Sequence, residues 1–139
     1  MTTMTQPAAP FAETRHGLAT TAALVLLFWI AAAAAVATAQ THLPPVSPAA
    51  ADAATIAAIL LAAYSYTRFC ARQAGITHAL GVGSAWLVLA VAAELVMEAR
   101  LAHHWYAILG SPDRPLLRNV LFFVWIFAPA LFARREGPR

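Results

Sequence analysis

The sequence predicts an all-α protein, a four-span transmembrane helical bundle with its helices in antiparallel, up-down-up-down order. Of its 139 residues 61% are hydrophobic and 11% are charged, and the mean hydropathy is +0.67. A soluble domain is only about 45–50% apolar and about 25% charged. The apolar residues gather in four blocks of about 20 residues, the length of helix that crosses roughly 30 Å of hydrocarbon. The chain length fits one domain and no second soluble module.

We expect spans at about residues 18–39, 50–72, 79–99 and 116–133, inside a membrane domain of residues 18–135. Residues 1–17 are Thr-, Pro- and Ala-rich and are expected to be a flexible tail, with a short C-terminal tail at 136–139. A signal peptide is the rival interpretation of the first block, because Arg15 precedes it and small residues follow it. Its uncharged run exceeds the usual 7–15 or so residues of such a signal, which favours a retained span.

Proline, glycine and hydroxyl residues mark the ends of the expected helices. Ser47 followed by Pro48 is typical of an N-cap and a first helical residue. Gly75 fits the position just after a helix, and Thr77 can cap the next one. The turn between spans two and three is therefore predicted to be short, joining them as a tight helical hairpin. Pro129 is expected to kink the fourth span.

The third block continues beyond the length of a span. From His78 to Gly110 there are about 32 residues, or roughly 48 Å of helix. This exceeds the hydrocarbon core, so the third span is expected either to tilt strongly and protrude as a helical extension or, as we favour, to bend near Arg100 into a short interfacial helix. One face of that helix would carry Leu101, Trp105, Ile108 and Leu109.

Small residues recur at helical spacing and predict close helix packing, because in lipid they let helix backbones approach one another. The residues expected to make these contacts are Ala31, Ala35, Ala54, Ala58, Ala62, Gly81 and Ala85.

A candidate polar cluster lies near the end of the third span. Glu94 and Glu98 are four residues apart and share a helix face. The remaining members are His103, His104, Arg118 and Asn119. Glu94 is expected about one turn inside the membrane boundary, facing protein and paired with Arg118, Asn119 or a histidine. An ionisable residue at such a depth suggests either an ion or proton site or an ion pair that locks helices together.

No cofactor, metal ion or catalytic residue is predicted. Adjacent histidines on a helix point about 100° apart, so His103 and His104 are poorly placed to share an ion, even with His42 on the same side. The patterns HExxH, GxSxG, GxGxxG and GxxxxGK[ST] are absent from the sequence. The single cysteine, Cys70, rules out an internal disulfide. Arginines sit at helix ends without a basic stripe, which argues against nucleic acid.

Arginine counts predict the orientation. With four spans, six arginines fall on the side of both termini: Arg15, Arg68, Arg72, Arg134, Arg135 and Arg139. Three fall on the other side: Arg100, Arg114 and Arg118. Because cytoplasmic segments carry the excess of positive charge, we expect a multi-pass protein of the plasma (inner) membrane with both termini in the cytoplasm.

The first functional hypothesis is a non-catalytic accessory or structural subunit that packs in the bilayer against other membrane proteins or against itself as a homo-oligomer. It rests on the small-residue faces of the first two spans, which exceed what a four-helix bundle needs for itself. The second is a small oligomeric carrier, coupled to ions or protons through Glu94. The third is a membrane enzyme acting on a lipid, with Glu94, Glu98 and the histidines.

Overall fold

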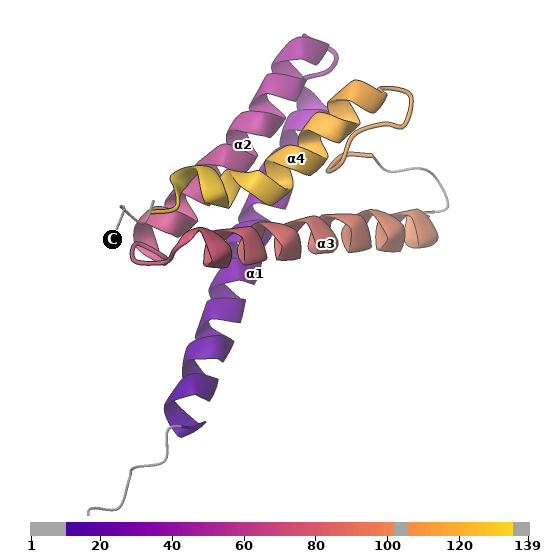
Figure 1. Ribbon diagram of the computed structural model, residues 1–139. Coiled ribbons are helices and arrows are strands. Elements are labelled where there is room, and N and C mark those ends of the chain that lie inside the picture. Colours follow the sequence, from indigo (N-terminus) through magenta and orange to yellow (C-terminus); the bar gives the residue numbers. More distant parts are fainter. Residues whose placement is uncertain (1–10, 102–105, 135–139) are drawn as a thin grey trace, which may run out of the picture.

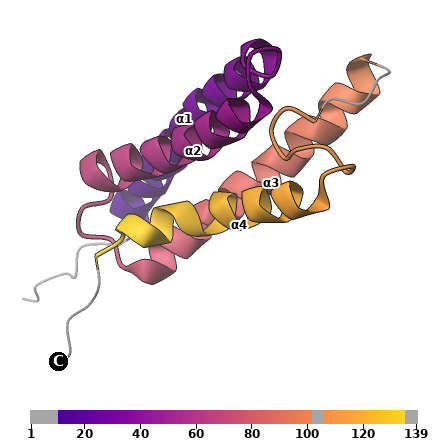
Figure 2. The same ribbon diagram turned by 90° about the horizontal axis from the view of Figure 1, so that it is seen from above.

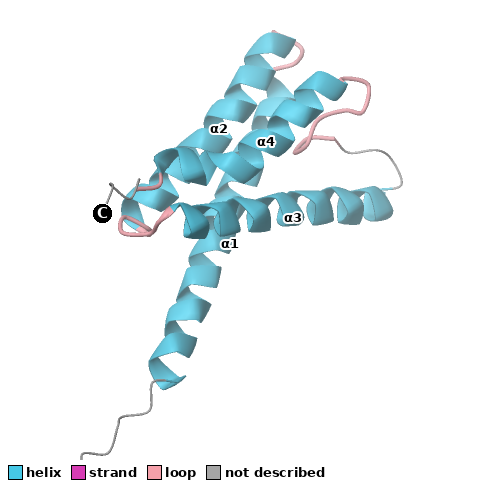
Figure 3. Ribbon diagram, in the orientation of Figure 1, coloured by secondary structure: helices cyan, strands magenta, loops and turns pink. Residues whose placement is uncertain are grey.

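The computed structural model describes residues 11–101 and 106–134, with side chains from Gly17 onward. All regular structure in these residues is helical: α1 (Phe11–His42), α2 (Pro48–Phe69), α3 (Ile76–Leu101) and α4 (Pro115–Phe132) (Figures 1 and 3). Each helix is long and apolar enough to cross a membrane. The four predicted segments are therefore confirmed as helices of transmembrane length, as a multi-pass membrane protein requires.

Helix α1 is longer than predicted at both ends. It begins at Phe11, within the segment expected to be a tail, and ends at His42. Its 32 residues give about 48 Å of helix, well over the thickness of the hydrocarbon core. Figure 1 shows that its N-terminal half extends away from the other three helices. One end of α1 therefore extends past the packed part of the protein.

The start of α2 agrees with the sequence pattern and its end does not. Ser47 accepts a hydrogen bond from the Ala50 N–H on its side-chain oxygen, at 3.2 Å, and Pro48 is the first helical residue. The helix ends early because the Tyr66 carbonyl accepts from two successive amides after Phe69, which breaks the regular i→i−4 pattern. The two caps predicted between α2 and α3 are wrong, since Gly75 lies in the connection and Thr77 lies inside α3.

The tight hairpin predicted for α2 and α3 is also wrong. The connection spans residues 70–75, and the two helices diverge from it instead of packing along their lengths. The main contacts are α1 with α2, α3 with α4, and α2 with α4, whereas α1 touches α3 only over a short stretch. Figure 2 shows the two pairs, α1 beside α2 and α3 beside α4. The α1–α3 seam is thus the least extensive of the four contacts between helices.

Aromatic rings from all four helices fill the middle of the fold. The Phe28 ring meets Tyr66 edge-on at 5.8 Å, Tyr66 meets Trp86 at 6.2 Å, and Trp86 meets Trp125 at 6.2 Å. These centroid separations lie in the favourable range for edge-to-face aromatic pairs. The two tryptophans are fully buried, and the Trp86 indole N–H donates to the Val25 carbonyl of α1 at 3.0 Å. The centre is therefore held by interlocking rings.

The small residues predicted to pack mostly lie beside the buried faces. Ala31 and Ala35 of α1 are exposed, and so are Gly81 and Ala85 of α3. The half-buried members of the predicted set are Ala54, Ala58 and Ala62. The buried positions instead are one or two residues away: Ala32 and Val36 on α1, Thr55, Ile59 and Ala63 on α2, and Val82, Gly83 and Trp86 on α3. The predicted small-residue faces are therefore displaced by one or two residues from the buried faces, which include other alanines such as Ala32 and Ala63.

Candidate functional site

Glu94 is the one charged side chain that is buried among the described residues, at 8% exposure. It lies on the inner face of α3, one turn above Ala90. Its carboxylate oxygen Oε1 accepts a hydrogen bond from the backbone N–H of Leu109, at 2.7 Å. The partner of this acid is thus a main-chain amide in the segment before α4.

That segment folds back between α3 and α4. Residues 106–110 form a turn, closed by a bond from the Gly110 N–H to the Tyr106 carbonyl at 3.1 Å. Gly110 has φ +83°, a left-handed conformation that glycine adopts without steric cost. Ile108 and Leu109 are 2% and 1% exposed, and the Ile108 carbonyl accepts from the Trp125 indole at 3.4 Å. This turn of residues 106–110 covers the end of the core, and we call it the plug.

The predicted interfacial helix is therefore wrong for residues 106–109, which form this turn; residues 102–105 lie outside the described residues. Ile108 and Leu109 were expected on an interface-facing surface and are instead buried against the protein. The Glu94 carboxylate supplies the physical reason. Its Oε1 accepts from the Leu109 amide, so the turn can bury the apolar side chains of Ile108 and Leu109 without leaving that amide unpaired.

The rest of the predicted polar cluster does not gather around Glu94. Glu98 lies exposed one turn further along α3, and Asn119 is exposed on α4. Arg118 is half-buried and places its guanidinium over the Phe122 ring, 5.8 Å from the centroid. Within the described part of the chain, no hydrogen bond joins Arg118 to Glu94. His103 and His104 lie outside the described residues.

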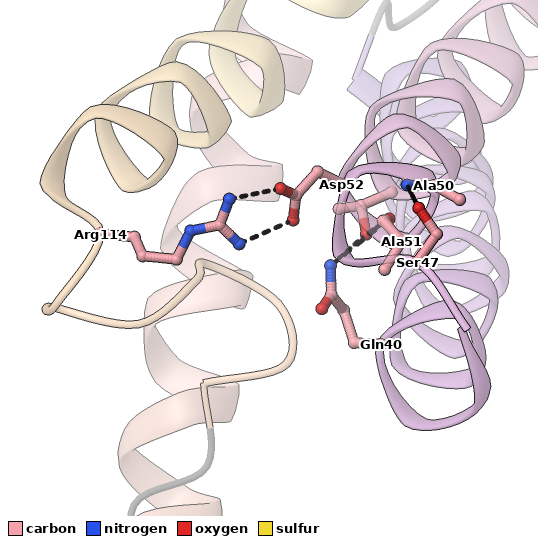
Figure 4. A network of polar contacts seen from close by, with 7 residues as sticks. Gln40, Ser47, Ala50, Ala51, Asp52 and Arg114 are labelled. Carbon is pink, nitrogen blue, oxygen red and sulfur yellow. Dashed lines mark hydrogen bonds and ion pairs between the residues drawn. The ribbon is translucent and has the colours of Figure 1, made fainter. Parts of the chain in front are cut away.

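A second polar cluster joins the same end of the fold, and sequence reasoning missed it. Figure 4 shows Arg114, which precedes α4, reaching Asp52 on α2 with both terminal nitrogens. The two contacts are 3.2 and 2.5 Å long. The charge and hydrogen bonds of Asp52 raise the pKa of Arg114 above its ordinary value, so the guanidinium stays protonated throughout the physiological range. This clamp ties the plug segment to the α1–α2 pair.

The α1–α2 pair carries its own polar bond beside the clamp. The Gln40 side-chain amide of α1 donates to the Thr55 hydroxyl of α2 at 2.8 Å, and Thr55 is fully buried. A cavity of about 330 Å³ lies between this bond and the plug, lined in part by Gln40, Asp52, Tyr106 and Arg114. One signal could have pointed here, because Asp52 is the single acidic residue in the second apolar block and an isolated charge there needs a partner.

The polar contacts at this end of the fold have a structural role. Three hydrogen-bonded pairs connect one segment of the chain to another: Glu94 to Leu109, Asp52 to Arg114, and Gln40 to Thr55. Within residues 17–101 and 106–134, no three His, Cys, Asp or Glu side chains come together as a metal site would require.

These features define the class of protein as a small, all-helical, multi-pass membrane protein. Comparison with models of protein families, with curated proteins and with solved structures finds no match for this chain.

Proposed function

We propose that this protein is a non-catalytic accessory or structural subunit that packs, through the outer half of α1, against another membrane protein or a second copy of itself. The observation that carries the proposal is the exposure of Ala31 and Ala35. In lipid, small residues mark the faces on which helices approach closely, whereas bulky side chains usually cover lipid-facing surfaces. This alanine face is left uncovered by α2, which packs on the neighbouring Ala32 and Val36.

Two further features support a packing role over a carrier. Rings of Tyr66, Trp86 and Trp125 occupy the centre of the fold, where a carrier needs a polar cavity. The Glu94 carboxylate is engaged by the Leu109 amide and covered by a buried turn. Both features suit a rigid body that presents a fixed surface to a partner.

In this proposal the helices alternate in direction across the plasma (inner) membrane, and both termini are cytoplasmic. The arginine distribution supports that orientation: Arg68, Arg72 and Arg134 lie at the end formed by the α2–α3 connection and the end of α4. The plug, the Asp52–Arg114 clamp and Glu94 then face the opposite side.

Site-specific photocrosslinking in intact membranes tests the proposed contact surface. A photoreactive phenylalanine analogue placed at Ala31 or Ala35 should give a protein adduct of one defined mass, heavier than the 14.8 kDa chain alone. The matched control positions are Ala92 and Ala99, which are exposed on α3 away from the proposed face. These should crosslink to lipid only.

A second measurement uses added bulk. Replacing Ala31 and Ala35 together with leucine should reduce the native mass in mild detergent to that of the free chain, because the helices can no longer approach closely. The pair Ala92→Leu and Ala99→Leu should leave the native mass unchanged. Two results together would contradict the proposal. The wild-type protein would have the native mass of the free chain, and the photoreactive analogue at Ala31 would crosslink to lipid alone.

A further inference from the structure

Two hollows meet at the end of the protein that carries Arg68, Arg72 and Arg134. One is a pocket of about 310 Å³ beside the α2–α3 connection, whose largely apolar wall carries the polar groups of Tyr66, Arg72 and His78; we name it the polar pocket for these groups. The other is an apolar groove of about 760 Å³ along the α1–α3 seam. Thr21 and His78 line both, so the two hollows lie side by side. A pocket with polar groups beside an apolar groove suits an amphiphile.

The polar pocket holds three groups that can bind an anion. The Tyr66 hydroxyl and the His78 Nε2 share a hydrogen bond of 3.0 Å, and their rings stack with 10° between the planes. When the Nε2–H donates to the Tyr66 oxygen, the hydroxyl proton of Tyr66 remains to bind an anion. The Arg72 guanidinium is tethered by a bond from its Nε to the Arg68 carbonyl at 3.0 Å. Within the described residues this leaves the two terminal Nη groups of Arg72 available. A guanidinium with two free amino groups suits a phosphate, which it can bind through two hydrogen bonds.

The groove matches the length of an acyl chain in one leaflet. On α3 its lining runs from His78 to Leu89, about 16 Å of helix, and half of the hydrocarbon core is roughly 15 Å. Its floor is hollow because Gly81 and Ala85 carry little or no side chain; a Cβ at Gly81 would meet nothing within 4 Å. Near the far end of the groove, Trp86 and Val25 join α3 to α1 by a hydrogen bond.

We propose that this site binds an anionic phospholipid. The phosphate lies in the polar pocket against Arg72, His78 and the Tyr66 hydroxyl, and one acyl chain lies in the α1–α3 groove. Charge complementarity selects the headgroup, because the Arg72 guanidinium lines the pocket beside the groove. The site lies on the opposite half of α1 from Ala31 and Ala35, so it is independent of the proposed protein contact.

Native mass spectrometry of the purified full-length protein, titrated with dioleoyl phosphatidylglycerol in a non-ionic detergent, tests the headgroup. One lipid per chain should bind, with dioleoyl phosphatidylcholine bound about tenfold more weakly or less. Arg72→Gln should weaken phosphatidylglycerol binding by about tenfold, the effect of losing a charge-assisted hydrogen bond. The matched control is Arg68→Gln, which removes the same charge at the same end but does not line the pocket. It should change the affinity less than twofold.

A second pair of variants tests the groove. Ala85→Leu fills the trough and should displace the lipid, whereas Ala57→Leu adds the same bulk to an exposed position of α2 and should not. Glycerol phosphate, the headgroup without its chains, should compete at least about a hundredfold more weakly than the whole lipid. Competition at equal concentration would assign the pocket to a soluble phosphate and overturn the proposal. Equal loss in Arg72→Gln and Arg68→Gln, or equal binding of the two lipids, would overturn it as well.

Discussion

The Ile126 carbonyl of α4 points at Gly83 of α3 at such close range that a Cβ at position 83 would overlap the oxygen. Gly83 is buried, and the atoms that a side chain would meet are backbone atoms, which cannot rotate away. The two helices therefore touch main chain to main chain at this point. Glycine permits the contact because it alone lacks the Cβ.

Gly83→Ala is expected to lower the free energy of unfolding by about 1–3 kcal/mol, the usual effect of overpacking a tight site. The control is Gly81→Ala, where an added Cβ meets nothing within 4 Å. That change should be neutral or stabilise the helix by roughly 0.5–1 kcal/mol. Unfolding in mixed micelles by titration with a denaturing detergent, followed by circular dichroism, measures both. Equal stability of the two variants would contradict the observed contact.

Glu94→Leu should release the plug, because it leaves the buried Leu109 N–H without an acceptor. A buried donor that loses its partner costs about 1–3 kcal/mol. Glu94→Gln keeps an oxygen at the same place and should retain most of the stability and all of the assembly. Hydrogen exchange of the Leu109 amide reports the bond directly, and exchange should accelerate strongly in the leucine variant alone. Unchanged protection of that amide in Glu94→Leu would show that another group holds the plug.

The Asp52–Arg114 clamp should behave as an exposed ion pair with specific geometry. Asp52→Asn and Arg114→Gln should each weaken the attachment of the plug to α2, and the double variant should cost less than the two single changes added together. Because Arg114 is 53% exposed, high salt should diminish the coupling. A double-mutant cycle at low and high ionic strength provides the measurement. Strict additivity at low salt would mean that the contact makes no contribution.

Cysteine labelling tests the orientation. In a Cys70→Ser background, needed because Cys70 is exposed, Val46→Cys should react with a membrane-impermeant thiol reagent added to intact cells. Thr5→Cys should react after the cells are opened and not before, since both termini are expected in the cytoplasm. The reverse pattern would invert the protein in the membrane while leaving its fold unchanged.

The helices could be predicted from the sequence because the length and hydropathy of a span are local properties. The faces of the helices could not. In α1 an alanine run extends from Ala31 to Ala35, so small residues lie on every side of the helix. The sequence therefore does not indicate which side is buried. The buried faces are those that pack around the rings of Trp86 and Trp125. The way the helices cross around these rings cannot be read from the sequence of any one helix.

The candidate site was predicted in part for a related reason. The burial of Glu94 followed from its depth in an apolar block, and the structure places it facing protein. Its partner was missed because the Leu109 amide is a backbone group, and every residue except proline has one. Asp52 and Arg114 were missed as a pair because 62 residues separate them. A span with one acid signals that a partner exists but does not say which arginine supplies it.

The Asp52–Arg114 clamp also constrains the order in which the helices can assemble during synthesis. Gln40 and Thr55 are 15 residues apart and can bond as soon as α2 has joined α1. Glu94 must wait for Leu109, which is made just before α4. Arg114 can reach Asp52 only when the first helical pair is already in place and the second is being completed. During synthesis the α1–α2 pair can therefore form before the α3–α4 pair, and the Asp52–Arg114 bond between the two pairs can be made only after Arg114 has been synthesised.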